Sequence, residues 1–312
     1  MSTIALGVLD FCFRAAGQAG SERLAETLNQ ATIVDELGYS RYWVVEHHGP
    51  EVAHASPELL VPLILGQTKQ LRAGPAGILL SYYSPFKVAD SFRTLEALFP
   101  GRVDLGVGRG RVDEATAAAL LDGATADQEY QRKVADLVGH VRGALPPDHP
   151  HVAAQASPSG TQSPDVWVLA SGGTSVPLAA RLGACCSIGL FQRQGALGAD
   201  PNHLRQYASE FQASPALPRP RANIAVAGVV AETTAEARAI LRTHNNPFIV
   251  PYLAGTPDEC RAQIEGLAAI YGVDEVIFGA LGDSHAARLQ SYQLLALAFG
   301  LGASAAATTE AA

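Results

Sequence analysis

The sequence predicts an α/β fold in which eight parallel strands alternate with helices. Short β-rich runs and amphipathic helical stretches follow one another along the whole chain, and no linker or internal repeat interrupts them. Most strand candidates are continuously apolar, as in the run 166–170. Parallel strands have this composition because helices cover both faces of their sheet. The pattern fits either a closed barrel or a long doubly wound sheet, and periodicity alone does not distinguish the two.

The expected elements follow in a regular order. Strands are predicted at 3–9, 41–45, 75–80, 103–107, 165–170, 185–190, 222–230 and 275–279. Helices are predicted at 21–37, 56–70, 85–98, 128–142, 175–183, 200–213, 233–243, 257–271 and 284–300.

The composition argues against nucleic acid and membrane as partners. The 312 residues include 22 Lys and Arg against 30 Asp and Glu, a net charge of −8, without any block of basic residues. Nucleic acids and anionic membranes attract basic patches or stripes. No apolar run reaches the roughly 18 residues of a membrane span. The N-terminal apolar run 4–9 is too short for a signal peptide. We therefore expect a cytoplasmic protein.

We expect a single barrel-sized domain over residues 1–301 and a disordered tail over 302–312. A chain of about 300 residues buries roughly 75% of its unfolded surface, enough for one large core. The tail is rich in Ala and Thr and shows no periodicity. The segment 143–164 has five prolines and is expected to be a long loop, of the kind that forms lids or insertions. Together with 245–255 it is a candidate wall of a substrate site.

The end of the fifth strand is a candidate phosphate site. The run there is Ser171, Gly172, Gly173, Thr174 and Ser175, immediately before a helix. Glycines allow close approach of the backbone, and a helix N-terminus offers free N–H groups. A turn that merely caps the helix is the alternative, and the sequence leaves both open.

Arg109 follows the fourth strand and is flanked by Gly108 and Gly110. Its guanidinium could supply the positive charge of a phosphate site as a bidentate donor. The alternative is a structural ion pair with Glu46 or Asp104.

His47 and His48 follow the second strand, directly after Glu46. Adjacent residues in extended backbone point to opposite sides, so at most one of the two histidines faces a barrel mouth. The unperturbed pKa of histidine, about 6.5, suits proton transfer near neutral pH. A metal site is a weaker interpretation because no further ligand lies at helical spacing from them. We expect no metal site.

Taken together, these strand ends resemble the luciferase-like family of flavin monooxygenases. The similarity spans nearly the whole chain with order and spacing intact. It is carried by the stretches RYWVVEHH at 41–48, SPELLVPLILGQTKQLRAGPAGILL at 56–80, SPFKVADSFRTLEALFPGRVDLGVGRG at 84–110, VWVLASGGTSVPLAARLGA at 166–184 and GTPDECRAQIEGLAAIYGVDEVIFGAL at 255–281.

The resemblance implies a (β/α)₈ barrel with loop insertions at its C-terminal face. It also implies that Arg109 and the run 171–175 hold a flavin phosphate, and that His47 assists the chemistry. Glu46, next to His47 in the sequence, is expected to be a second catalytic residue that orients His47. Ala76 and Gly77 fall where the family often has a non-proline cis peptide against the flavin ring. Gly108 stands where bacterial luciferase has a reactive cysteine, so thiol chemistry and light emission are not expected.

The activity implied by the resemblance is that of a two-component monooxygenase. A separate reductase would supply reduced FMN, which reacts with oxygen to a C4a-peroxyflavin that oxygenates a small organic substrate, with secondary metabolism as a setting. The chain has no GxGxxG nucleotide fingerprint of its own. A deazaflavin-dependent hydride transfer and a flavin-binding protein without turnover are the alternatives. The apolar helices 56–70 and 85–98 are expected to form a homodimer contact.

Overall fold

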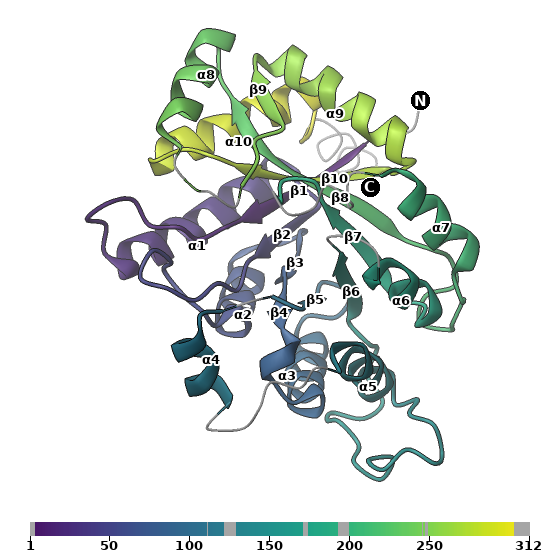
Figure 1. The fold of residues 1–312 in the computed structure, drawn as a ribbon. Helices are drawn as coiled ribbons and strands as arrows, with labels where there is room; N and C mark the ends of the chain where they lie inside the picture. Colours follow the sequence, from purple (N-terminus) through teal and green to yellow (C-terminus); the bar gives the residue numbers. More distant parts are fainter. Residues whose placement is uncertain are drawn as a thin grey trace, which may run out of the picture.

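The computed structural model shows a nearly closed barrel of parallel strands with helices around it (Figure 1). It describes residues 4–110, 112–121, 129–170, 174–192, 200–244, 246 and 249–302. The strands are β1 (Ala5–Asp10), β2 (Arg41–Val44), β3 (Arg72–Pro75), β4 (Ile78–Leu79), β5 (Asp104–Gly108), β6 (Asp165–Ala170), β7 (Cys185–Gly189), β8 (Ala222–Val230), β9 (Leu253–Gly255) and β10 (Glu275–Ala280).

The sheet order is β3-β2-β1-β10-β8-β7-β6-β5-β4, and β9 pairs with β8. A parallel bridge between Ala73 and Val103 joins β3 to the start of β5 and thereby links the two ends of this order. Every expected strand is present. The one expected at 75–80 consists of two pieces, β3 and β4, on either side of the cis peptide Ala76–Gly77. The barrel implied by the resemblance is therefore confirmed.

The helices form the outer layer, and all those expected are present. They are α1 (Gly20–Glu36), α2 (Pro57–Gln67), α3 (Pro85–Leu98), α4 (Glu114–Leu121), α5 (Tyr130–Arg142), α6 (Ser175–Arg181), α7 (Asn202–Glu210), α8 (Thr234–Thr243), α9 (Pro257–Tyr271) and α10 (His285–Phe299), with a 3₁₀ turn η1 (Leu80–Tyr82). The sequence missed α4, η1 and β9. The last two are too short for a periodic signal, and α4 buries no residue, so it has no amphipathic pattern.

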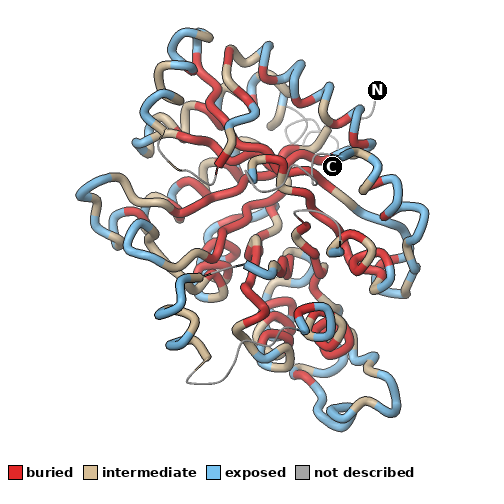
Figure 2. The backbone as a smooth tube through the Cα atoms, in the orientation of Figure 1, coloured by how far each residue is buried: buried red, intermediate tan, exposed pale blue. Residues whose placement is uncertain are grey.

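Buried residues concentrate in the strands and on the inner sides of the helices (Figure 2). Several helices begin where their sequence encodes a cap. The Ser84 hydroxyl accepts from Lys87 N at the start of α3, and Thr256 with Glu259 forms a reciprocal capping box on α9. Cys185 and Cys186 are free thiols buried in β7.

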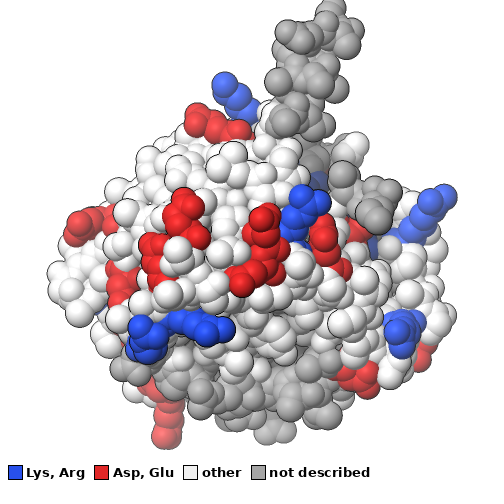
Figure 3. All heavy atoms as spheres, turned by 90° about the horizontal axis from the view of Figure 1, so that it is seen from above, with Lys and Arg blue, Asp and Glu red and all other residues white. Residues whose placement is uncertain are grey.

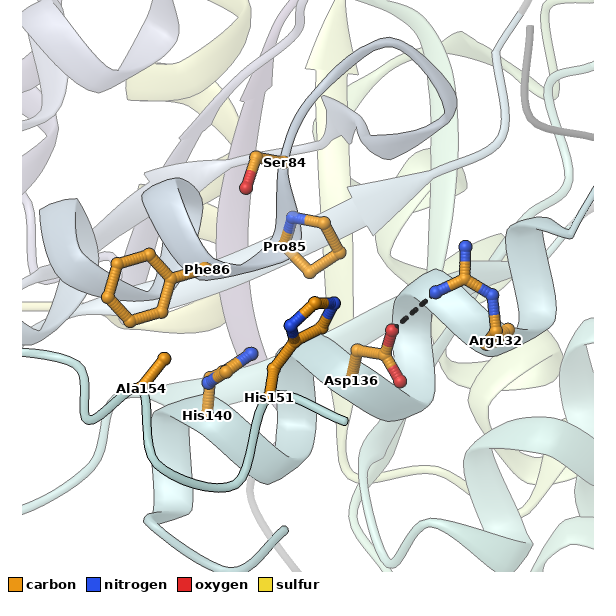
Figure 4. A pocket seen from close by; sticks show the side chains of 8 residues that line it. All are labelled: Ser84, Pro85, Phe86, Arg132, Asp136, His140, His151 and Ala154. Carbon is orange, nitrogen blue, oxygen red and sulfur yellow. Dashed lines mark hydrogen bonds and ion pairs between the residues drawn. The ribbon is translucent and has the colours of Figure 1, made fainter. Parts of the chain in front are cut away.

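The segment 143–164 does not lie at the mouth formed by the C-terminal ends of the strands. It connects the end of α5 to the start of β6, so both of its ends lie at the opposite end of the barrel. It packs outside the barrel, where His151 and Ala154 line a cavity of about 370 Å³ with side chains of α3 and α5 such as Phe86 and His140 (Figure 4). The expectation that this segment walls a substrate site is therefore wrong.

The interior of the barrel near the N-terminal ends of its strands holds a network of buried charges. The Arg41 guanidinium donates to Asp104 Oδ2 at 2.6 Å and to Glu275 Oε1 at 2.7 Å. It also lies over the rings of Trp43 and Trp167, 5.4 and 4.8 Å from their centroids. Nearby arginines lower the pKa of Asp104 against the opposing effect of its burial.

On the face shown in Figure 3, acidic and basic side chains of the described residues are interspersed. None of the described helices is long and apolar enough to cross a membrane. Of the tail expected at 302–312, residues 303–312 lie outside the described part of the chain.

Candidate active site

The side chains singled out from the sequence lie at the C-terminal ends of neighbouring strands, where parallel barrels carry their active sites. His47 follows β2, the Ala76–Gly77 peptide separates β3 from β4, and Arg109 follows β5. Thr174 and Ser175 begin α6 after β6. Ser171, Gly172 and Gly173 lie outside the described residues.

His47 is held by an aromatic neighbour and has an unused ring nitrogen. Its ring stacks on Phe13, with centroids 5.5 Å apart and planes 16° from parallel. Nδ1 is inaccessible to solvent and has no hydrogen-bond partner. Burial lowers the pKa of His47, opposed by the nearby Glu51 carboxylate. The imidazole is therefore kept neutral near pH 7, with a nitrogen available for a hydrogen bond or a proton.

His48 points elsewhere, as expected for adjacent residues. Its Nε2 lies 3.0 Å from Glu46 Oε1. The prediction that Glu46 orients His47 is therefore wrong, because that carboxylate contacts His48.

Glu46 joins β2 to β4. Its side chain is 1% exposed, and Oε2 accepts from Leu79 N at 2.9 Å. Oε1 accepts from the Tyr83 hydroxyl at 2.6 Å as well as facing His48. Burial and then this carboxylate raise the pKa of Tyr83. With both oxygens engaged in this way, Glu46 is a positioning residue that fixes the strand directly after the cis peptide, and the catalytic role expected for it is replaced by this one.

Arg109 is exposed, and its guanidinium lies 5.3 Å from the centroid of the Tyr130 ring. Among the described residues no carboxylate pairs with it. Glu46 is engaged as above, and Asp104 binds Arg41 and Arg72. The structural ion pair of Arg109 with Glu46 or Asp104 is therefore wrong, and the described residues leave its charge available to an anion.

The glycines near Arg109 differ in what surrounds them. A Cβ on Gly108 would meet nothing within 4 Å, so the backbone there faces open space. A Cβ on Gly77 would lie 2.7 Å from the backbone of Gly106 on β5, so Gly77 is required for strand packing. Ala76 is partly exposed beside it.

The phosphate-loop residues that are described are compatible with ligand binding. Thr174 is exposed, and its hydroxyl makes no capping hydrogen bond to α6. An exposed hydroxyl free of the helix can donate to an anion.

Sequence reasoning missed an aromatic group that follows β1 and β7. Phe11 packs edge-on against Phe191, with centroids 5.2 Å apart, and stacks on Phe13 at 6.0 Å. Val250 N donates to Phe191 O, which brings part of the segment 245–255 to this group. Within the rest of that segment, 253–255 is β9, whereas 245, 247 and 248 are outside the described residues. The signal was the spacing of Phe11 and Phe13 directly after a strand end.

Comparison with known proteins gives a family and a set of relatives. The family model described as luciferase-like monooxygenase matches residues 5–275. The uncharacterized protein YceB of Bacillus subtilis is 36% identical over 242 residues, which cover 76% of this chain and 72% of that protein. A luciferase-like monooxygenase of Escherichia coli K12 is 31% identical over 257 residues, covering 79% of this chain and 72% of the other.

Among solved structures, apo-MsnO8 has a TM-score of 0.84 and 32% identity, and the match covers 96% of this chain and 99% of that one. This chain thus combines the barrel with a histidine pair after β2 and an arginine after β5. Its relatives are similar to it in both sequence and fold. The chain belongs to the luciferase-like monooxygenase family and is an oxidoreductase of the oxygen-incorporating class.

Proposed function

We propose that the protein uses reduced FMN and molecular oxygen to insert one oxygen atom into a small organic substrate. The observation that carries this proposal is the division of the mouth into two kinds of surface. One side offers the exposed cation Arg109, with no carboxylate partner in the described part of the chain, next to the open Gly108 backbone. The other offers aromatic side chains and the unpartnered Nδ1 of His47.

The residues after β5 and β6 fit the phosphate end of FMN. Arg109 would hold the phosphate by charged hydrogen bonds, supported by the hydroxyls of Thr174 and Ser175. Reduced FMN supplies the electrons that activate oxygen, of which one atom goes to the substrate and the other to water.

The chain's own residues then have separate tasks. Phe11, Phe13 and Phe191 exclude water from the reacting groups. His47, neutral near pH 7, accepts or returns a proton at Nδ1 on the substrate side. Glu46 keeps β4 and the preceding cis peptide in place through Leu79 N.

FMN and a deazaflavin are the two candidate cofactors, and each is used by a solved structure that shares only the fold with this chain. A Pseudomonas putida Baeyer–Villiger monooxygenase component in complex with FMN is 17% identical, with a TM-score of 0.72. An F420-dependent secondary alcohol dehydrogenase is 14% identical, with a TM-score of 0.65. The longer acidic tail of a deazaflavin would favour additional basic residues, and beyond Arg109 the sequence offers Arg111, which lies outside the described residues. This favours FMN.

Two partners belong to the proposal. A separate reductase would supply reduced FMN, because the chain lacks a GxGxxG fingerprint for a nicotinamide cofactor. A second copy of the chain would cover α2 and α3, where Leu59, Leu63 and Leu98 are 66%, 51% and 65% exposed.

Anaerobic titration tests the proposal. Reduced FMN should bind the protein, and admission of oxygen with a candidate substrate should give an oxygenated product. A reduced deazaflavin serves as the parallel arm. Hydride transfer from the deazaflavin, with no oxygenated product from reduced FMN, would instead indicate the deazaflavin-dependent oxidoreductase. Binding of either flavin without turnover would indicate that the chain is a flavin-binding protein without catalytic activity.

A further inference from the structure

The loop between β2 and α2 folds back onto the residues that follow β1. Val52 forms an antiparallel bridge with Phe13, and Ala53 N donates to Cys12 O at 3.0 Å. Phe13 in turn stacks on His47. The next residue after Ala53 is His54, so this pairing places a second histidine in the same corner of the barrel mouth as His47.

His54 has no hydrogen-bond partner on either side of its ring. Both Nδ1 and Nε2 are inaccessible to solvent and unpartnered. Five other described histidines have one such nitrogen, and His54 is the only one among the described residues with two. Buried polar groups are almost always hydrogen-bonded, so a pair of unused nitrogens on one ring needs an explanation.

The charged neighbours of His54 cannot satisfy it, because they are engaged with one another. Asp10 Oδ1 accepts from Cys12 N and Arg23, and Oδ2 accepts from Thr27 and Tyr42. Arg23 also donates through Nε to Phe13 O.

His54 is also kept uncharged. Burial lowers its pKa to about 4, with Asp10 opposing this change and Arg23 and His47 adding to it. A neutral imidazole has one N–H donor and one acceptor nitrogen. The partner it suits is a neutral group with oxygen, either a hydroxyl, which donates and accepts, or a carbonyl, which accepts.

We propose that His54 is a substrate-positioning residue that binds a hydroxyl or carbonyl oxygen of an otherwise apolar, aromatic substrate beside His47. This rests on the proposed function in that the bound molecule is the one to be oxygenated. The aromatic group of Phe11, Phe13 and Phe191 contacts the apolar body of such a molecule, and His54 fixes its orientation. Specificity follows because a substrate without the oxygen leaves unpaired the buried ring nitrogen that the oxygen would contact.

The test compares two probes of similar shape, 1-naphthol and 1-methylnaphthalene. Their dissociation constants are measured by titration calorimetry with the full-length protein, without reductant, so that no turnover occurs. His54→Ala should reduce the preference for 1-naphthol over 1-methylnaphthalene by roughly 3- to 10-fold, the loss of one neutral hydrogen bond. His54→Gln, whose amide both donates and accepts, should restore most of the preference. His151→Ala removes an exposed histidine from the segment outside α3 and α5 and should leave the preference unchanged.

A second readout does not depend on affinity. The ring nitrogen resonances of His54 in a long-range ¹H–¹⁵N spectrum should shift with 1-naphthol and not with 1-methylnaphthalene. An unchanged probe preference in His54→Ala, an equal loss of both probes, or unshifted resonances would each overturn the assignment. Since neither experiment uses reduced flavin or oxygen, failure of the oxygenation chemistry would be seen separately in the anaerobic titration.

Discussion

The two ends of the barrel differ in how completely their ionisable side chains are paired. At the N-terminal end, Arg41, Asp104 and Glu275 are buried and engage one another, and each carboxylate oxygen has a donor. At the C-terminal mouth carboxylates are paired as well, but among the described residues ring nitrogens of His47 and His54 have no partner and no carboxylate pairs with Arg109.

The difference separates stability from function. Charges that are paired inside a barrel contribute to the structure only as a complete set, because removing one leaves another buried without compensation. Polar groups left unpaired at the mouth carry a cost in the free protein that a ligand can recover. Substitutions at the first end should therefore change unfolding, and substitutions at the second should change binding and turnover.

Arg41→Ala should have the largest effect on stability. It leaves Asp104 and Glu275 buried without their shared cation, and breaking a buried pair in this way costs about 3–5 kcal/mol. Denaturant unfolding measures the change. Arg205→Ala on the exposed side of α7 is the control and should stay within about 0.5 kcal/mol of the wild type. A loss below about 1 kcal/mol for Arg41→Ala would contradict the importance assigned to the network.

His47→Ala should lower turnover by about 10²- to 10⁴-fold, the usual contribution of a general acid or base. Binding of reduced FMN should change little, and the share of reduced flavin whose oxidation gives hydrogen peroxide without product should rise. The measurement is product per flavin oxidised in a single turnover. His48→Ala should instead reduce stability, since it removes a contact of Glu46. If His48→Ala abolishes product and His47→Ala retains it, the two roles are reversed.

His54 should make the stability depend on pH. Its pKa of about 4 in the folded protein is below the usual 6.5, so between these values the unfolded chain binds a proton that the folded chain does not. Stability should therefore fall as the pH is lowered from 6.5 to 4, by about 2–3 kcal/mol from this residue. His54→Gln should remove that part of the decrease in denaturant unfolding measured across this range. An identical pH dependence in both proteins would show that His54 is not buried in neutral form.

Arg109→Ala should weaken binding of reduced FMN by roughly 10- to 150-fold, corresponding to a charged hydrogen bond of about 1.5–3 kcal/mol. Unfolding should be unaffected because the guanidinium is exposed. Arg109→Lys keeps the charge without the bidentate geometry, so its affinity for reduced FMN should lie between those of the wild type and Arg109→Ala. Unchanged affinity together with lost stability would mean that Arg109 is structural after all.

Leu63→Glu on α2 should have only a small effect on stability. Leu63 is 51% exposed, so unfolding of the monomer should change by no more than about 0.5 kcal/mol. The variant should nevertheless sediment as a monomer at concentrations where the wild type is a dimer. Ile270→Glu on α9, at a site 53% exposed, is the matched control and should leave the assembly unchanged. A wild-type monomer at micromolar concentration would contradict the dimer.

Much of this arrangement could be predicted from the sequence. Apolar runs and helical periodicity located all eight expected strands and their helices because each strand is buried on both faces and each helix on one. The resemblance gave the closed barrel, the cis peptide at Ala76–Gly77 and the position of His47 at a strand end. It did not give the partner of each side chain.

The sequence by itself determined the order of elements and the residue types at the strand ends, since both follow from local patterns along the chain. Only the tertiary structure decided which groups are paired. Glu46 is adjacent to His47 in sequence, yet it contacts His48, Tyr83 and Leu79, because alternate side chains of an extended segment face opposite sides. Neither the isolation of Arg109 nor the two unused nitrogens of His54 is visible in the sequence, because a missing partner is a property of everything packed around a side chain.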